Sequence, residues 1–286
     1  MKKEDIHIRD PFILAENGTY YMFGTTGPMW NGKCTRLDAY TSTDLENFEG
    51  PFKVFEAPEG FWADQNFWAP EVHNYKGKYY MFASFYADGY HRASQILVSE
   101  KPLGPYLPLS DGPITPSDWE CLDATLYVDK EDKPWVIYSH EWTQIDDGEF
   151  CAQMLSDDLK TTVSGPLTLF AASEAKWVAA HEERDGVKQY VTDGPFIYEA
   201  ADGALIMTWS SMSAGGYAAG QARSENGITG PWKQIDQAVF DKDGGHGMLF
   251  RDFNGNLFFS IHRPNAGPER PVFLPMKEEN GLLYVK

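Results

Sequence analysis

The sequence predicts an all-β fold, a five-bladed β-propeller with four antiparallel strands per blade, and three observations lead to it. A hairpin pattern occurs five times, at residues 9–26, 68–84, 122–139, 192–210 and 245–262. Each copy has two apolar, aromatic-rich segments joined by a turn such as Asn-Gly or Asp-Gly, which is typical of a β-hairpin. No segment shows a sustained helical period, and Gly and Pro turns recur throughout. We therefore expect one propeller domain over residues 1–286.

The spacing of the copies leaves room for four strands in each blade. The markers of the five hairpin starts are Asp10, Glu71, Asp123, Asp193 and His246, at intervals of 61, 52, 70 and 53 residues. Three similar segments, 99–106, 156–166 and 224–232, are expected to join a third strand to a fourth. The C-terminal segments ERPVFLPM and GLLYVK are expected as the outer strands of the fifth blade. The N-terminal strand is then the innermost strand of the first blade, and no strand is exchanged between the termini.

The composition excludes some classes of partner. A formal net charge of −18 opposes binding to nucleic acid or to anionic membrane surfaces and favours a neutral or cationic ligand. Cys34, Cys121 and Cys151 have no metal-ligand spacing and are too few for a disulfide framework. No run of about 18 apolar residues exists. We expect a soluble monomer or weak oligomer, cytoplasmic as the sequence stands, or secreted if a signal peptide was removed.

Acidic residues mark four of the five hairpin starts, where the inner strands of a propeller converge on the axis. Asp is common at strand entries and turns, which is the structural explanation. Several carboxylates on one axis repel unless they are protonated, paired or bound to a cation, so a functional explanation is favoured. Glycoside hydrolysis needs such a pair, one carboxylate ionised to activate water and one protonated to donate to the leaving oxygen.

Five short motifs occur in order on the five hairpins: Arg9-Asp10-Pro11, Trp68-Ala69-Pro70-Glu71-Val72, Leu122-Asp123-Ala124, Asp193-Gly194-Pro195 and Gly245-His246-Gly247. Together they resemble glycoside hydrolase family 43 over nearly the whole chain. The resemblance implies an inverting mechanism with Asp10 as the general base and Asp123 as the residue that tunes the acid and orients the substrate. The structural alternatives are a turn or bulge cap at Asp10 and a carboxylate that binds backbone amides at Asp123.

The general acid is the point where this sequence departs from the family pattern, which usually has Glu before Gly-Pro where this chain has Asp193. Aspartate is one methylene shorter, so its proton would lie about 1.5 Å further from the glycosidic oxygen. A misplacement of that size costs about 100-fold in rate. Glu141, in Ser139-His140-Glu141-Trp142, is the alternative acid. Glu182 and Glu183, in the polar segment before the fourth blade, are weaker alternatives.

Supporting roles are expected at four further residues. Trp68 is predicted to form a wall of the sugar pocket, with blade packing as the alternative. Glu71 is predicted to bind a sugar hydroxyl or an arginine, and Arg263 a catalytic carboxylate or a substrate hydroxyl, with ordinary ion pairs as the alternative. At His246 the resemblance implies contact with a hydrated metal ion, so a structural calcium ion is expected there, although the chemistry requires no cofactor. A hydrogen-bonded core histidine is the alternative.

The predicted function is an inverting glycoside hydrolase that acts on arabinose-containing plant-type glycans, an α-L-arabinofuranosidase. Related activities, on β-xylosides, on the internal bonds of arabinan or on galactosides, belong to the same class of hydrolase. The alternative class is a glycan-binding propeller without catalysis, for which the departure at Asp193 is the main argument.

Overall fold

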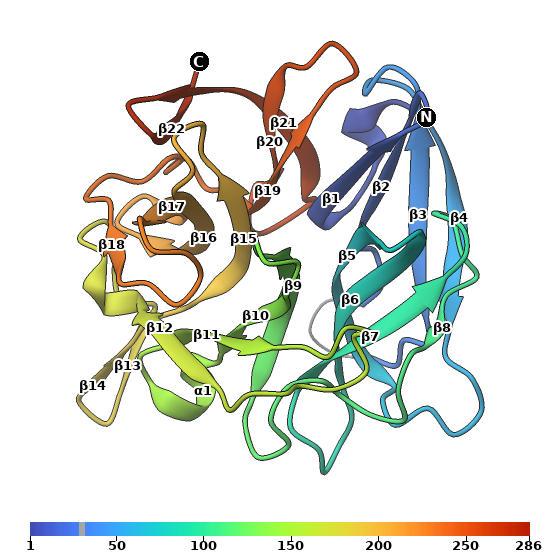
Figure 1. The fold of residues 1–286 in the computed structure, drawn as a ribbon, viewed down its shortest axis with the longest axis horizontal. Helices are drawn as coiled ribbons and strands as arrows, with labels where there is room; N and C mark the ends of the chain where they lie inside the picture. The colour runs from blue at the N-terminus through green and yellow to red at the C-terminus, as the bar shows by residue number, and fades with distance from the viewer. Residues whose placement is uncertain (29–31) are drawn as a thin grey trace.

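The computed structural model, which describes residues 1–28 and 32–286, contains five four-stranded antiparallel sheets arranged as blades around a central axis (Figure 1). Within each sheet the strands follow chain order. The first blade, blue in the figure, lies beside the last, which is red, and their inner strands β1 and β19 are in contact. The predicted five-bladed β-propeller is confirmed.

The strand bounds follow the predicted repeats. The first two blades consist of β1 (Arg9–Glu16), β2 (Thr19–Thr25), β3 (Arg36–Ser42) and β4 (Phe48–Glu56), then β5 (Gln65–Tyr75), β6 (Lys78–Tyr86), β7 (Ala93–Ser99) and β8 (Leu107–Pro108). The third and fourth consist of β9 (Cys121–Val128), β10 (Pro134–His140), β11 (Glu149–Met154) and β12 (Leu167–Ala171), then β15 (Asp193–Glu199), β16 (Leu205–Ser213), β17 (Gly216–Ser224) and β18 (Trp232–Gln234). The fifth consists of β19 (Gly245–Arg251), β20 (Leu257–Arg263), β21 (Arg270–Glu279) and β22 (Leu282–Val285).

The predicted closure of the ring is confirmed. The two C-terminal segments form β21 and β22, which pair with β20 and with each other. The first strand, β1, pairs with β2 in its own blade, so no strand is exchanged between the termini. The three similar connectors join third to fourth strands in the second, third and fourth blades, as predicted.

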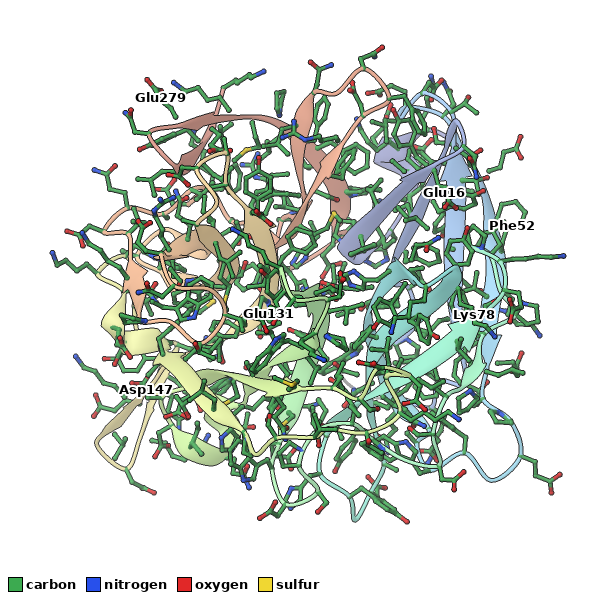
Figure 2. The ribbon with its side chains drawn as sticks, in the orientation of Figure 1. Glu16, Phe52, Lys78, Glu131, Asp147 and Glu279 are labelled. Atoms are coloured by element: carbon green, nitrogen blue, oxygen red, sulfur yellow. The ribbon has the colours of Figure 1, made fainter. Side chains whose placement is uncertain are left out.

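Apolar side chains fill the spaces between neighbouring blades. In one cluster, Phe23 of β2 packs with Phe85 of β6 and Phe250 of β19, which joins the first blade to both of its neighbours. Between the third and fourth blades, the rings of Phe150 and Trp209 lie 5.4 Å apart. Charged side chains such as those of Lys78 and Glu279 are exposed, and Glu279 lies at the outer edge of the ring (Figure 2). This packing holds the starts of the inner strands in fixed relative positions.

Two elements are additions to the five blades. The short helix α1 (Trp142–Ile145) follows β10, and a hairpin of β13 (Glu182–Arg184) and β14 (Val187–Gln189) lies where the sequence predicted only a polar segment. Gln189 Nε2 donates to Asp146 Oδ1 at 2.7 Å, which ties this hairpin to the end of α1. The 3₁₀ turns η1 (Lys3–Asp5) and η2 (Ala172–Glu174) complete the elements. In the described ranges, no helix has the length and apolar character to cross a membrane.

Candidate active site

Each inner strand has a β-bulge at or near its start, and five of these bulges, one from each blade, build the site. The strand register shifts at the start of β1, β5, β9, β15 and β19. One residue in each bulge has a positive φ, namely Asp10 (54°), Ala69 (46°), Asp123 (57°), Gly194 (53°) and His246 (49°). Bulges redirect side chains, and left-handed backbone at non-glycine residues is concentrated at functional sites. The residues that correspond to Asp10, Asp123 and His246 are therefore Ala69 in the second blade and Gly194 in the fourth. They are not Glu71 and Asp193.

Side chains of the preceding blade accept hydrogen bonds from the backbone N–H groups of the bulged residues. At four of them the acceptor is a side chain on that blade's second strand, at 2.8–3.2 Å: His262 for Asp10, Thr25 for Ala69, Ser84 for Asp123 and Ser210 for His246. Gly194 differs, because its N–H donates to Asp123 Oδ2 at 3.0 Å. The Asp123 carboxylate thus binds a backbone amide, as its structural interpretation predicted, and this amide follows Asp193 directly.

A cavity of about 300 Å³ opens where the bulges meet. Six of the residues singled out from the sequence line it, namely Asp10, Trp68, Asp123, Glu141, Asp193 and His246. Glu71 and Arg263 are not among its lining residues. The structure therefore brings the three predicted catalytic aspartates and the alternative acid into one pocket.

Asp10 is held as an ionised carboxylate. Thr25 Oγ1 donates to its Oδ2 at 2.6 Å, and His246 Nδ1 lies 3.2 Å from its Oδ1. Burial acts to raise the pKa of Asp10, but the neighbouring basic groups, His246 foremost and also Arg9, oppose this, and the pKa is held well below its ordinary value. Asp10 is therefore in the form that can accept a proton from water.

The neighbouring His262 is neutral and fixes the backbone of Asp10. Its Nδ1 accepts the Asp10 N–H, and its Nε2 lies 3.3 Å from Asn265 Oδ1, which assigns the ring proton to Nε2. Burial lowers the pKa of His262, in agreement with a neutral ring. The base is thus anchored to the fifth blade through its own N–H.

Asp123 and Asp193 differ from Asp10, because their pKa values are raised and not lowered. Burial, followed by the Asp10 carboxylate, raises the pKa of Asp123 well above its ordinary value. Burial, followed by Asp123, raises the pKa of Asp193 to about 7. The hydroxyl of Tyr217 donates to Asp193 Oδ2 at 2.8 Å. Asp193 can therefore carry a proton near neutral pH, which is what a general acid needs.

Glu141 lies at the end of the third blade's second strand and pairs with Arg92. An Arg92 guanidinium N–H donates to Glu141 Oε2, and the guanidinium carbon lies 4.7 Å from the centroid of the Trp68 ring. Burial raises the pKa of Glu141, while Arg92 opposes this shift. A guanidinium pairs with an ionised carboxylate, so this contact fits a binding or positioning role better than proton donation.

Glu71 and Arg263 point elsewhere for reasons of strand geometry. Glu71 Oε2 lies 3.1 Å from Nε2 of His73 on the same strand. Arg263 Nε donates to the carbonyl of Lys242 at 2.7 Å, and the side chain is exposed. Successive side chains alternate between the two faces of a strand. The residue of this motif that faces the axis is consequently His262, the immediate neighbour of Arg263.

Sequence reasoning missed several residues of the pocket. They are Arg92 and Tyr217, which contact the carboxylates, and Trp142, His181, Met212 and Asn265, which line the wall. Trp142 belongs to α1 and His181 directly precedes β13, and their rings meet edge to face at 5.2 Å. Both additions to the propeller thus reach the pocket.

The surroundings of His246 do not form a direct metal site. Its Nδ1 faces Asp10 Oδ1 at 3.2 Å and Asp123 Oδ2 at 3.6 Å. Among the residues that the structure describes, no group of three His, Cys, Asp or Glu side chains is arranged to hold a metal ion. Calcium needs six to eight oxygen ligands. The donors present do not fit direct coordination of calcium, and we derive no step through a metal.

A pocket that joins an ionised carboxylate to a second carboxyl with a pKa of about 7, at the axis of a five-bladed propeller, has the groups that a glycoside hydrolase needs. The sequence model of the glycosyl hydrolases family 43 matches residues 5–277, and the chain belongs to this family. The glycan-binding alternative without catalysis is not supported.

Known relatives agree with this assignment. The crystal structure of an endo-arabinase from Bacteroides thetaiotaomicron VPI-5482 is 43% identical, with a TM-score of 0.92 and 98% of each chain covered. An extracellular exo-α-(1→5)-L-arabinofuranosidase of Cellvibrio japonicus (strain Ueda107) is 25% identical over 87% of this chain and 71% of its own. The extracellular endo-α-(1→5)-L-arabinanase 1 of Bacillus subtilis (strain 168) is 25% identical over 48% of this chain and 45% of its own length.

Proposed function

We propose that the chain hydrolyses α-L-arabinofuranosyl bonds of arabinose-containing glycans with net inversion, Asp10 being the base and Asp193 the acid. The observation that carries the proposal is that one cavity holds both carboxyls in contrasting surroundings, Asp10 beside Thr25 and His246, and Asp193 beside Tyr217. The pKa of Asp10 is held well below its ordinary value, and that of Asp193 is raised to about 7. Such a separation is how active sites assign the roles of acid and base to like groups.

The proposed reaction uses these groups in one step. Asp10 takes a proton from a water molecule, whose oxygen forms a bond to the anomeric carbon as the glycosidic bond breaks. Asp193 gives its proton to the departing oxygen. Asp123 accepts the Gly194 N–H next to the acid, and burial, followed by Asp123, keeps the pKa of Asp193 high. Inversion requires base and acid carboxyls roughly 6.5–9.5 Å apart, leaving room for the water.

The substrate class rests on the relatives and on the wall of the pocket. Three relatives carry arabinan or arabinofuranoside names, one of them at 43% identity. Trp68 and Trp142 line the cavity, and aromatic faces suit sugar rings. Release of single arabinofuranosyl residues is the proposed activity. Internal cleavage of arabinan is the second candidate, because the 43% identical relative is named an endo-arabinase.

The test is a digestion of linear α-1,5-arabinan oligosaccharides and of an aryl α-L-arabinofuranoside, followed by proton NMR. Inversion predicts that the β anomer of arabinose appears first, with the α anomer formed later by mutarotation. Arabinose as the main early product supports the exo mode, and mixed oligosaccharides support the endo mode. First release of the α anomer would contradict inversion, and no release from either substrate would contradict the arabinose specificity.

The pH dependence of kcat/KM follows from the two pKa shifts. Asp10 must be ionised, and because its pKa is lowered, its protonation costs activity only below the ordinary aspartate range. Asp193 must be protonated, so activity should decline as pH rises through about 7. We expect a plateau on the acid side of neutrality and a falling limb near pH 7, measured on an aryl arabinofuranoside. A rising limb near neutral pH would be incompatible with these assignments.

Three further expectations accompany the proposal. The chemistry requires no cofactor, and a calcium ion near His246 stays a sequence-based prediction that a chelator titration of thermal stability can test. A monomer or weak oligomer also stays a prediction, which light scattering of the purified protein can test. The compartment, cytoplasmic or secreted, also stays a prediction, although two relatives are named extracellular.

A further inference from the structure

The fifth blade lacks a side chain at a position that the other four use to line the pocket. The residue directly before the bulge lines the cavity in the first four blades, as Arg9, Trp68, Leu122 and Asp193. In the fifth blade this residue is Gly245. A Cβ on Gly245 would lie 2.7 Å from Cε1 of Tyr217. The missing side chain therefore makes room for the Tyr217 ring, which comes from β17 of the fourth blade.

Tyr217 is placed against the proposed acid and is fixed on its other sides. Its side chain is 3% exposed, and its hydroxyl donates to Asp193 Oδ2 at 2.8 Å. Its ring lies nearly parallel to the imidazole of His262, at 19° and 5.5 Å between centroids. Burial, followed by the Asp193 carboxylate, raises the pKa of Tyr217 well above its ordinary value, so the hydroxyl remains a donor.

We propose that Tyr217 is a positioning residue that orients the carboxyl of Asp193 for proton donation. Because Oδ2 accepts the phenolic hydrogen bond, Oδ1 is left to carry the proton given to the leaving oxygen. A short aspartate in place of the family's usual glutamate depends on such orientation, since its reach is smaller. The inference rests on the proposed function, in which Asp193 is the acid.

The other charged groups around Asp193 do not make this contact. They are Arg9 and Asp10 of β1, Asp123 of β9 and His246 of β19. Asp123 raises the pKa of Asp193, whereas His246 and the Tyr217 hydrogen bond lower it. Removal of the hydroxyl alone should therefore move the pKa of Asp193 upward, while the other charges stay in place.

The first test replaces Tyr217 by phenylalanine, which keeps the ring and removes the hydroxyl. We expect kcat on arabinan oligosaccharides to fall about 10-fold with little change in KM, since the hydrogen bond to the carboxylate that forms as the proton leaves Asp193 is lost. The loss should be smaller on aryl arabinofuranosides, whose leaving groups need less protonation. The falling limb of the pH profile should move up by about 1 unit.

Tyr138→Phe is the matched control. Tyr138 is also fully buried, and its hydroxyl donates to Gln153 Oε1 at 2.8 Å, away from the pocket. This variant should keep the wild-type profile. The proposal is overturned if Tyr217→Phe keeps kcat within about twofold with an unmoved limb, or if both variants show the same change.

A second measurement is independent of any substrate, and so separates this inference from the proposed function. The ¹³C-labelled carboxyl of Asp193, assigned by its loss in Asp193→Asn, is titrated by NMR in wild type and in Tyr217→Phe. An upward shift supports the contact, and an unchanged or lowered pKa overturns it, even if the wild type cleaves no arabinoside. If Tyr217→Phe does not fold, 3-fluorotyrosine at position 217 is a stronger donor and should lower the pKa of Asp193 instead. An unchanged pKa there would equally refute the contact.

Discussion

Asp10→Asn is expected to lower kcat/KM on an active arabinofuranoside by about 100- to 10,000-fold while the fold is retained. An amide cannot accept the proton of the attacking water, although it has nearly the same shape as the carboxylate. The contacts with Thr25 and His246 should keep the side chain in place. Kinetics on purified protein measure the loss of kcat/KM, and circular dichroism with a thermal melt shows whether the fold is retained.

The control for this variant is Asp38→Asn. Asp38 on β3 is also buried, at 6% exposure, but it pairs with Arg36 outside the pocket. Its replacement should leave kcat/KM near the wild-type value. Near-normal activity of a folded Asp10→Asn protein, or an equal loss in both variants, would show that Asp10 is not the base.

Asp193→Ala is expected to separate substrates by their leaving groups. On arabinan oligosaccharides, whose departing alkoxide needs a proton, the loss should be about 100- to 10,000-fold. On an aryl arabinofuranoside with a phenolate that leaves unaided, the loss should be about 10-fold or less. The ratio of kcat/KM on the two substrates is the quantity to measure.

Glu141→Ala is the comparison that decides between the two candidate acids. Because Glu141 pairs with Arg92, which lies over Trp68, its removal should disturb binding and reduce activity on both substrates to a similar extent. The reverse pattern would transfer the role of acid to Glu141. Asp193 would then be a positioning residue.

Much of the fold was predictable because its signals are local. Asn-Gly and Asp-Gly turns between aromatic-rich segments specify hairpins, and five copies at similar spacing specify blades. The acids at positions 10, 123 and 193 were found because they stand at the entries of these hairpins. The hairpin of β13 and β14 and the helix α1 were missed, since each is too short to show a period of its own.

The site residues were predicted less well, because neighbouring side chains on a strand point to opposite faces. Arg263 and His262 are neighbours in the chain, yet only His262 faces Asp10. A bulge inserts one residue and changes which side chain faces the axis, and its exact place is set by pairing with the next strand. For the same reason the repeat position of the second blade is Ala69, and Glu71 contacts His73 instead of lining the pocket.

By itself the sequence determined the five-blade architecture, the closure of the ring without strand exchange and the set of acids at the axis. Only the tertiary structure decided which of those acids is ionised and which is protonated. A carboxyl pKa depends on burial and on charges within a few ångströms. Those charges come from other blades: Asp10 of the first blade meets His246 of the fifth, and Asp193 of the fourth blade meets Asp123 of the third. Distances of this kind arise only when the blades pack around the axis, so no local pattern of residues encodes them.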